Sequence, residues 1–311
     1  MKIAYLISVY KDELQLRRTI EALFQGEYTY FFVHVDKKVD QVLFEQALFP
    51  QYKEYVKFTS QRYWVQWGGF NQVRYQKCLL EECINSGMSF DRVFIITGQD
   101  YPLVSNEEIN RELETNSLKE YIIGMNMSKE EIPLHAKQNI TLYHYFRDLE
   151  GVSYKVKKIF SGISRLIMRL LPFRKKDYLV INGERWDVYK ASSYMCITFN
   201  LAKYLVEQLN TNKILMKYFR YSFVPEEMVI PTIVFNSKFK NQCQLLKGNN
   251  CCNLLALSSI TYFDYGDSIK TFTEKDIEEL RACGRMFARK FTSGLSDELI
   301  KILKNRKIAY K

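Results

Sequence analysis

The chain has 311 residues, 47% of them hydrophobic and 26% charged, which excludes a disordered or fibrous protein and allows one large domain or two small ones. The net charge is +10, but eight basic residues and no acidic residue lie between Val152 and Lys176, whereas the other 37 basic and 35 acidic residues nearly cancel. An excess this local disfavours a protein built around nucleic acid.

Residues 1 to about 125 alternate short apolar runs with segments of helical periodicity. This pattern predicts a mostly parallel sheet flanked by helices. We expect strands near 3–9, 30–35, 92–97 and 119–124, and helices over 13–24, over 72–84 and from Ser105. Three of these strands end at Val9, Val35 and Thr97, and open α/β sheets bind their ligands at that edge.

The alternation stops after residue 125. Over residues 154–176, apolar residues recur at spacings of three and four while basic residues occupy the other face, which predicts a basic amphipathic helix ended by Pro172. Such a helix either lies on an anionic membrane surface or packs on the core with its charges in solvent. The segment itself does not decide between these two interpretations.

The remaining chain predicts one more strand and several helices. We expect a strand over 192–198 and helices over 201–209, 226–235, 273–282 and 296–304. The whole chain, residues 1–311, is therefore interpreted as a single α/β domain. Residues 1–125 form the half with the regular alternation, and residues 126–311 form the half that contains the basic helix.

Polar residues follow the ends of two predicted strands. Asp36 follows the second strand, where its carboxylate can accept hydrogen bonds from a ribose or a uracil, although a turn aspartate gives the same pattern. Gly98, Gln99 and Asp100 follow the third strand. The glycine permits close backbone approach, and Asp100 is expected to face a ligand over the sheet edge, although ordinary loop chemistry is the alternative.

Two further segments contain candidate binding or catalytic residues. Trp67, followed by two glycines, is either part of a flexible ligand loop or a connector held by a tryptophan. Glu226 and Glu227 are predicted in the first turn of a helix, where the helix dipole stabilises their charged forms. Helix-start acids are usually structural, but a rigid ionised carboxylate is also what a general base requires, and Glu227 fits that role.

A cationic pair lies near the C-terminus. Arg289 and Lys290 alternate with aromatic residues, which suits a phosphate whose charge must be neutralised, although exposed snorkelling cations look similar. No Asp-x-Asp occurs in the chain, so the usual metal-bridged nucleotide-sugar site is not visible and a cationic pair would replace the ion. With only three histidines, we expect neither a metal nor another cofactor.

The cysteines and the apolar runs indicate the cellular compartment of the protein. The seven cysteines include no C-x-x-C pair, so the sequence indicates neither a zinc ribbon nor a disulfide framework and favours a reducing cytoplasm. The first residues lack the features of a signal peptide, and no window reaches the roughly 18 apolar residues of a membrane span. We therefore expect a cytoplasmic protein, with peripheral binding to the inner face of the membrane as a further hypothesis.

Together, these segments resemble the core-2/I-branching β-1,6-N-acetylglucosaminyltransferase family, which also contains peptide O-xylosyltransferases. The resemblance covers nearly the whole chain and rests on several short motifs in the same order. They are Lys2–Ile7, His34–Lys38, Trp67–Gly69, Gly98–Leu103, Pro225–Glu227 with Thr232–Ile233 and Asn236–Ser237, and Leu280 through Phe291.

The resemblance implies a GT-A-type fold with a Rossmann-like sheet, a UDP-sugar donor, inversion at the anomeric carbon and no metal requirement. It also implies that residues 1–125 are the nucleotide-binding half and residues 126–311 the acceptor and catalytic half. By position, Glu227 looks like the family's catalytic base and Glu226 like its neighbour. Asp36, with Ser8 and Val9, looks like the nucleoside contact. Lys290 matches a basic residue set against the diphosphate.

This chain departs from the family at several positions. Some animal members place an arginine where this chain has Thr261, so we expect Arg289 or Arg285 to replace it. The family's Gly-Ser-aromatic loop beside the acceptor corresponds to a segment that contains Ser193 and Tyr194, in which the glycine is replaced. The luminal disulfides and the anchor of the animal enzymes are also absent, which is typical of a bacterial-type member.

Three hypotheses follow. The first is an inverting transferase that adds N-acetylglucosamine to a glycan or a lipid-linked oligosaccharide, with peripheral contact to an anionic membrane. The second is a transferase of the same fold with another donor, such as UDP-xylose. The third is a non-catalytic module that binds a glycan, a nucleotide or a nucleic acid, and the confinement of charge to one segment disfavours nucleic acid as the ligand.

Overall fold

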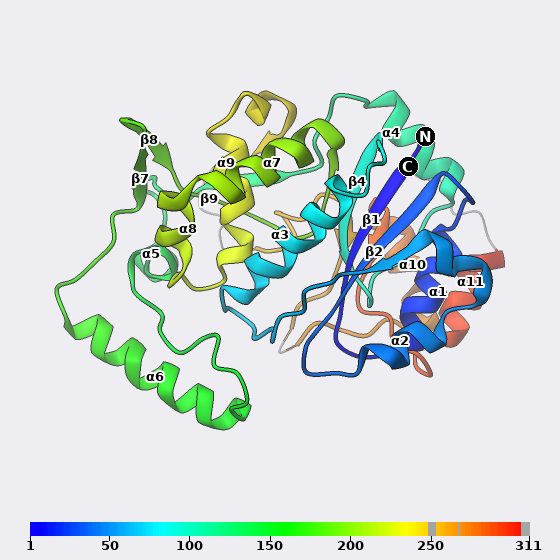
Figure 1. The fold of residues 1–311 in the computed structure, drawn as a ribbon, viewed down its shortest axis with the longest axis horizontal. Coiled ribbons are helices and arrows are strands. Elements are labelled where there is room, and N and C mark those ends of the chain that lie inside the picture. Colours follow the sequence, from blue (N-terminus) through cyan, green and yellow to red (C-terminus); the bar gives the residue numbers. More distant parts are fainter. Residues whose placement is uncertain (248–252, 267, 306–311) are drawn as a thin grey trace.

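A five-stranded sheet forms the centre of the molecule in a computed structural model, which describes residues 1–247, 253–266 and 268–305 (Figure 1). Four of the strands are parallel, and the fifth joins antiparallel at one edge. In spatial order the strands are β10 (Met195–Thr198), β4 (Arg92–Thr97), β1 (Ile3–Val9), β2 (Thr29–Val35) and β3 (Val56–Phe58).

Strand β1 shows why this sheet is central. Its apolar side chains alternate between two cores, because successive side chains of a strand point to opposite faces. Ala4 and Leu6 belong to one core, and Tyr5 and Ile7 belong to the other. Burial on both faces accounts for the unbroken apolar runs in the sequence.

Helices cover both faces of the sheet. The face that contains Leu6 packs against α3 (Asn71–Ile84) and α7 (Phe199–Thr211), and the opposite face packs against α1 (Glu13–Leu23) and α11 (Asp297–Asn305). The other helices of the first half are α2 (Gln41–Ala47) and α4 (Asn106–Thr115), the latter begun by a Ser105–Glu108 capping box. The predicted α/β class is confirmed.

Smaller sheets attach the rest of the chain to this centre. One joins β11 (Gln244–Leu245), β6 (Ile123–Asn126) and β9 (Tyr189–Ala191). Another joins β12 (Thr261–Tyr262), β13 (Phe287–Ala288) and β5 (Tyr101–Pro102). A hairpin and further helices complete the described chain: β7 (Tyr178–Ile181), β8 (Glu184–Asp187), α5 (Leu134–Thr141), α6 (Tyr154–Leu170), α8 (Lys213–Phe219), α9 (Val229–Phe235) and α10 (Ile277–Ala282), with 3-10 turns η1 (Pro50–Tyr55), η2 (Pro225–Glu227), η3 (Lys238–Gln242) and η5 (Glu274–Asp276).

The predicted helix over 226–235 is wrong in its first turn. The structure has the 3-10 turn η2 there, and α9 begins only at Val229. A continuous helix would need an N–H from Pro231 to bond the Glu227 carbonyl, and proline has none. With the helix starting at Val229, Pro231 lies in its first turn, where an N–H has no intrahelical partner. Glu226 and Glu227 are therefore not at an α-helix N-terminus.

Three other boundaries differ from expectation. The strand predicted over 119–124 begins at Ile123, because before it Tyr121 pairs with Cys196 only as an isolated bridge and the Glu120 N–H bonds the Gln242 carbonyl. The strand expected over 192–198 begins at Met195. The helix expected over 273–282 is divided into η5 and α10.

Helix α6 extends away from the body of the molecule at its lower left in Figure 1. It ends at Leu170, two residues before Pro172, as the proline predicts. Within the described residues, none of the helices has the length and hydrophobicity that crossing a membrane requires. The cysteines of that same part of the chain are free thiols, and Cys251 and Cys252 lie outside it.

Candidate active site

A cavity of about 530 Å³ opens at the carboxyl ends of β1, β2 and β4. Nearly all of the candidate residues line it, although they come from distant parts of the sequence. The predicted residues in the lining are Ser8, Val9, Asp36, Trp67, Gly98, Gln99, Ser193, Tyr194, Glu226, Glu227, Arg289 and Lys290.

The ends of β1 and β4 form the floor of the cavity. A Cβ on Gly98 would lie 2.5 Å from the Val9 Cγ1, so only glycine allows the two strand ends to approach this closely. The Gly98 N–H donates to the Ser8 carbonyl at 3.0 Å. Gln99 accepts a hydrogen bond from the Tyr10 hydroxyl at 3.2 Å and is thereby held against this floor.

Asp100 does not line the cavity, contrary to expectation. Its side chain is fully buried, and its carboxylate accepts hydrogen bonds from the N–H and hydroxyl of Thr97 at 2.5 and 2.7 Å. The carboxylate thus closes the turn that follows β4 instead of facing a ligand. Burial raises its pKa, and nearby Arg289 acts in the opposite direction.

Asp36 connects the end of β2 to a neighbouring loop. Its carboxylate pairs with the Lys38 ammonium at 3.2 Å and accepts a hydrogen bond from the Val65 N–H at 3.4 Å. Beside it, the His34 ring stacks on Tyr75 with centroids 5.1 Å apart. Burial, together with Arg62, lowers the pKa of His34 to about 4, so this ring is neutral. This wall of the cavity therefore combines a carboxylate with flat aromatic surface.

The loop at Trp67 forms part of the rim. A Cβ on Gly68 would meet the Phe223 ring at 2.6 Å, and one on Gly69 would meet the Asp148 carboxylate at 2.2 Å. Trp67 itself contacts the Phe223 ring edge-on, with centroids 5.0 Å apart. The two glycines are therefore needed for the loop to pack closely on Phe223 and Asp148. The loop is thus a well-packed part of the cavity wall.

The C-terminal cations reach the opposite wall. Arg289 lies over the Tyr194 ring, with its guanidinium carbon 4.7 Å from the centroid, and its Nε has no hydrogen-bond partner. Burial lowers the pKa of Lys290, and Arg289 and Lys11 add to this effect. Three cations close together at one wall create a positive potential that suits an anionic ligand such as a diphosphate.

The structure distinguishes the two proposed replacements for the family arginine. Thr261 is fully buried in β12, beside β13, and does not line the cavity. The Arg289 N–H donates to the Tyr262 carbonyl at 2.9 Å, and the Arg289 side chain lines the cavity. Arg285 is not among the lining residues that the described chain supplies. The geometry therefore favours Arg289.

Glu226 and Glu227 lie next to each other in different surroundings. Glu226 is 3% exposed, and its Oε2 has no hydrogen-bond partner. Burial and then the charge of Glu227 raise the pKa of Glu226 well above its usual range. Glu227 pairs with the Lys190 ammonium, with 3.2 Å between Oε2 and Nζ, and its side chain is 18% exposed. Burial raises the pKa of Glu227, whereas Lys190 lowers it.

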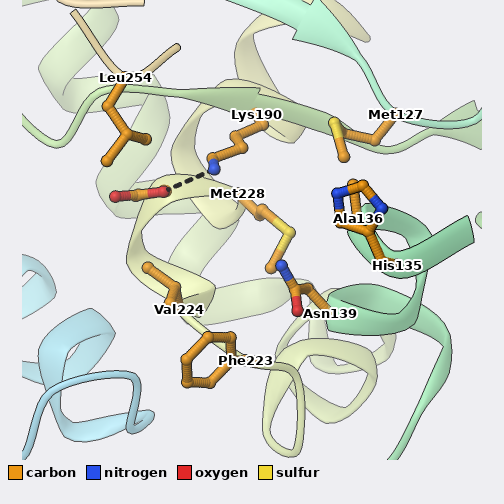
Figure 2. A pocket seen from close by; sticks show the side chains of 10 residues that line it. Met127, His135, Ala136, Asn139, Lys190, Phe223, Val224, Met228 and Leu254 are labelled. Atoms are coloured by element: carbon orange, nitrogen blue, oxygen red, sulfur yellow. Dashed lines mark ion pairs between the residues drawn. The ribbon is translucent and has the colours of Figure 1, made fainter. Parts of the chain in front are cut away.

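A second cavity of about 180 Å³ shares the Glu227–Lys190 pair with the first (Figure 2). Figure 2 shows Lys190 directed toward the carboxylate, with Met228 beside the pair and Asn139 below Met228 in this view. The pair therefore lies where the large cavity meets the smaller one. The smaller cavity is lined by Met127, His135, Ala136, Asn139, Lys190, Phe223, Val224, Glu227, Met228 and Leu254.

Lys190 is the main site residue that the sequence reasoning missed. It lies on β9, a strand of three residues in a segment without clear periodicity, so nothing in the sequence indicated it. Phe223 and Asn139 were missed for the same reason, because each follows or lies in a short element of this second half. In the described chain, no three His, Cys, Asp or Glu side chains are grouped so that they could hold a metal ion.

Comparison with known proteins places the chain in a family. The model of the Core-2/I-branching enzymes matches residues 3–247. The chain belongs to this family. Similar proteins include xylosyltransferase 2 of Rattus norvegicus and of Homo sapiens, each 25% identical over 97% of this chain and 33% of that protein. Xylosyltransferase sqv-6 of Caenorhabditis briggsae is 22% identical over 77% of this chain and 27% of its own length.

The matched relatives are longer than this chain. It spans about a third of the length of these xylosyltransferases. Among solved structures, S. aureus TarS aligns at a TM-score of 0.33 with 12% identity, over 91% of this chain and 39% of that one. Mouse xyloside xylosyltransferase 1, in its apo form, aligns at 0.32 with 11% identity, over 79% and 84%.

Proposed function

We propose that this chain is an inverting glycosyltransferase that transfers xylose or N-acetylglucosamine from a UDP-sugar to a hydroxyl of a glycan or a lipid-linked oligosaccharide. The observation that carries the proposal is the position of Glu227 at the junction of two cavities. The large cavity has room and charge for a nucleotide-sugar, and the small one has room for part of an acceptor. Membership of the family and the xylosyltransferase relatives support the transfer of a sugar.

Glu227 is proposed as the general base. Its pairing with Lys190 favours the ionised carboxylate, which can remove the proton from the acceptor hydroxyl. The acceptor oxygen then forms a bond to the anomeric carbon on the face opposite UDP, while the bond from that carbon to the diphosphate oxygen breaks. Its electron pair leaves with UDP, and the proton stays on Glu227 until solvent removes it. Inversion follows from this single displacement.

Arg289 and Lys290 are proposed to stabilise the departing UDP. Negative charge grows on the diphosphate as the bond breaks, and preplaced cations lower the barrier by a few kcal/mol in comparable sites. These cations would provide the charge that a metal supplies in other transferases, so we propose that the reaction needs no metal. Asp36 and the aromatic wall at His34 suit the nucleoside end of the donor.

A UDP-release assay tests the proposal. Wild type and Glu227→Gln would be compared over a panel that includes UDP-xylose and UDP-N-acetylglucosamine, with EDTA present throughout. Release from one donor that survives EDTA and is lost in the variant is the expected result. If no donor releases UDP but calorimetry detects UDP binding, the chain is a nucleotide-binding module, and if UDP does not bind either, the whole assignment fails.

A further inference from the structure

Helix α6 packs its polar side on the protein and leaves its apolar side in solvent. The residues that face the body are Lys157, Ser161 and Ser164, which are 2%, 6% and 7% exposed. Their spacing of four and three places them on one face of the helix. In a helix that packs on its own core this face would be apolar. The packing therefore rules out the core-packed interpretation of the segment.

Another face of the helix is an exposed, continuous apolar surface. Its residues recur at helical spacing, and the last of them, Leu170, is 80% exposed. An apolar face of this size is uncommon on an isolated soluble domain and marks a binding surface. The α6 surface consists of Val156, Ile159, Phe160, Ile163, Leu166, Ile167, Leu170 and, beyond the helix, Phe173.

Charge indicates what covers the α6 surface. Lys155, Lys158, Arg165 and Arg169 are exposed on the face beside the apolar one, and the sequence has no acid between Val152 and Lys176. A second copy of the chain carries the same cations, and because like charges repel, the charge of this segment disfavours pairing of two copies through it. An anionic surface with an apolar interior can bury the apolar side chains of the helix and bind its basic side chains at the same time.

We propose that α6 binds the surface of a membrane that contains anionic phospholipids. The helix lies in the plane of the interface, with the apolar face among the upper acyl chains and the basic face at the headgroups. Each basic residue near such a surface contributes about 1 kcal/mol, and the apolar side chains add the hydrophobic term. This binding is peripheral, because α6 does not meet the requirements of a membrane-crossing helix.

Contacts at the start of α6 connect it to the rim of the large cavity. The Lys157 ammonium donates to the Gln66 side-chain oxygen at 3.1 Å and to the Trp67 carbonyl at 3.5 Å. Just before the helix, the Asp148 carboxylate accepts hydrogen bonds from the N–H groups of Phe70 and Asn71 at 2.9 and 3.0 Å. The membrane-bound helix is thereby held to the loop that forms the cavity wall.

This connection bears on the substrate. If the proposed function holds, a cavity attached to a membrane-bound helix takes its acceptor from that membrane, so the acceptor is a lipid-linked sugar and not a soluble glycan. The choice of acceptor rests on the proposed function, whereas membrane binding by α6 does not.

Vesicle flotation of the full chain tests the binding. The vesicles would contain phosphatidylcholine alone or with about a quarter phosphatidylglycerol, at an ionic strength near 0.1 M, where the Debye length is about 10 Å. Wild type is expected to float with the anionic vesicles only. Ile163→Gln/Leu166→Gln/Leu170→Gln should raise the lipid concentration for half-binding at least about tenfold. Arg165→Glu/Arg169→Glu should raise it at least about thirtyfold.

The matched control is Leu43→Gln/Leu118→Gln/Leu295→Gln, which removes three exposed apolar side chains elsewhere and should float like wild type. Three results would overturn the proposal. The first is wild type that floats with neither kind of vesicle. The second is wild type that floats equally with both kinds and is unaffected by the charge reversal. The third is wild type that binds no vesicles but is a dimer in light scattering, with the α6 apolar variant a monomer.

UDP release separates this proposal from the proposed function. The α6 variants should hydrolyse the donor like wild type but lose transfer to a lipid-linked acceptor in vesicles. Flotation without any UDP release would leave membrane binding in place and reject the transferase. Equal transfer by wild type and the α6 variants would reject the acceptor assignment.

Discussion

Helices α3 and α6 are both amphipathic, but they use their apolar faces in opposite ways. Helix α3 buries Val73, Leu79 and Leu80 against the central sheet. Helix α6 buries Lys157 and two serines and exposes its apolar face. Periodicity shows that one side of a helix is apolar, but only the neighbouring elements show what covers that side. The exposed apolar face of α6 therefore indicates a binding surface, whereas the buried face of α3 indicates only a core contact.

The largest expected effect lies in the cavity that α3 helps to form. Glu227→Gln removes the carboxylate that would accept the acceptor proton, so transfer should fall about 10²- to 10⁴-fold. Glu184→Gln, on the exposed face of β8, should leave the rate unchanged. The measurement is initial UDP release with acceptor present. An unchanged rate in Glu227→Gln would remove the base assignment.

Lys290→Met should lower kcat by about 10²- to 10³-fold, because a preplaced cation acts mainly on the charge that develops on the leaving group. Donor KM should change less than kcat. The control is Lys275→Met, at an exposed position outside the cavity. A variant that loses only donor affinity would make Lys290 a binding residue without a role in the chemical step.

A pair of leucine substitutions tests the comparison of α3 with α6 directly. Leu80 on α3 is fully buried, so Leu80→Ala should lower the free energy of unfolding by about 3 kcal/mol. Leu166 on α6 is 60% exposed, so Leu166→Ala should change it by less than about 0.5 kcal/mol. Urea denaturation measures both. Equal losses would mean that protein covers the α6 face.

The smallest effect concerns pH. Glu227 must be ionised to accept a proton, so activity should fall as the pH falls through its pKa, which burial raises and Lys190 lowers. Lys190→Met removes the lowering effect and should shift the acid limb of the rate profile upward by about one pH unit. Lys190→Arg keeps the charge and should leave the limb in place. A downward shift in Lys190→Met would contradict the pairing.

The sequence predicted the sheet and its ligand edge well, because parallel strands buried on both faces give unbroken apolar runs. Val9, Asp36 and Gly98 follow such runs, and all three line the cavity. Asp100 shows the limit of that reasoning. Its position after β4 was predicted correctly, but its carboxylate turns back to bond Thr97. Side-chain direction at a strand end depends on the local turn, which a run of apolar residues does not specify.

The second half of the chain was harder to predict. Its strands are two to four residues long, too short to show a period, and Lys190 lies on one of them. The sequence around Glu227 predicts a helix because acids after a proline are typical of a helix start, whereas the structure has a 3-10 turn there. The decisive residue was Pro231, whose missing N–H delays the helix. Short elements that are stabilised by tertiary contacts show little hydrophobic periodicity in the sequence.

Strand β10 has a consequence for engineering this protein. It comes from the second half of the chain and pairs with β4 at the edge of the central sheet. A fragment that stops at residue 125 would leave β4 as an apolar edge with unpaired N–H and C=O groups, which invites aggregation. The two halves are therefore not exchangeable modules. A chimaera between relatives that changes the acceptor must keep β10 together with the sheet it completes.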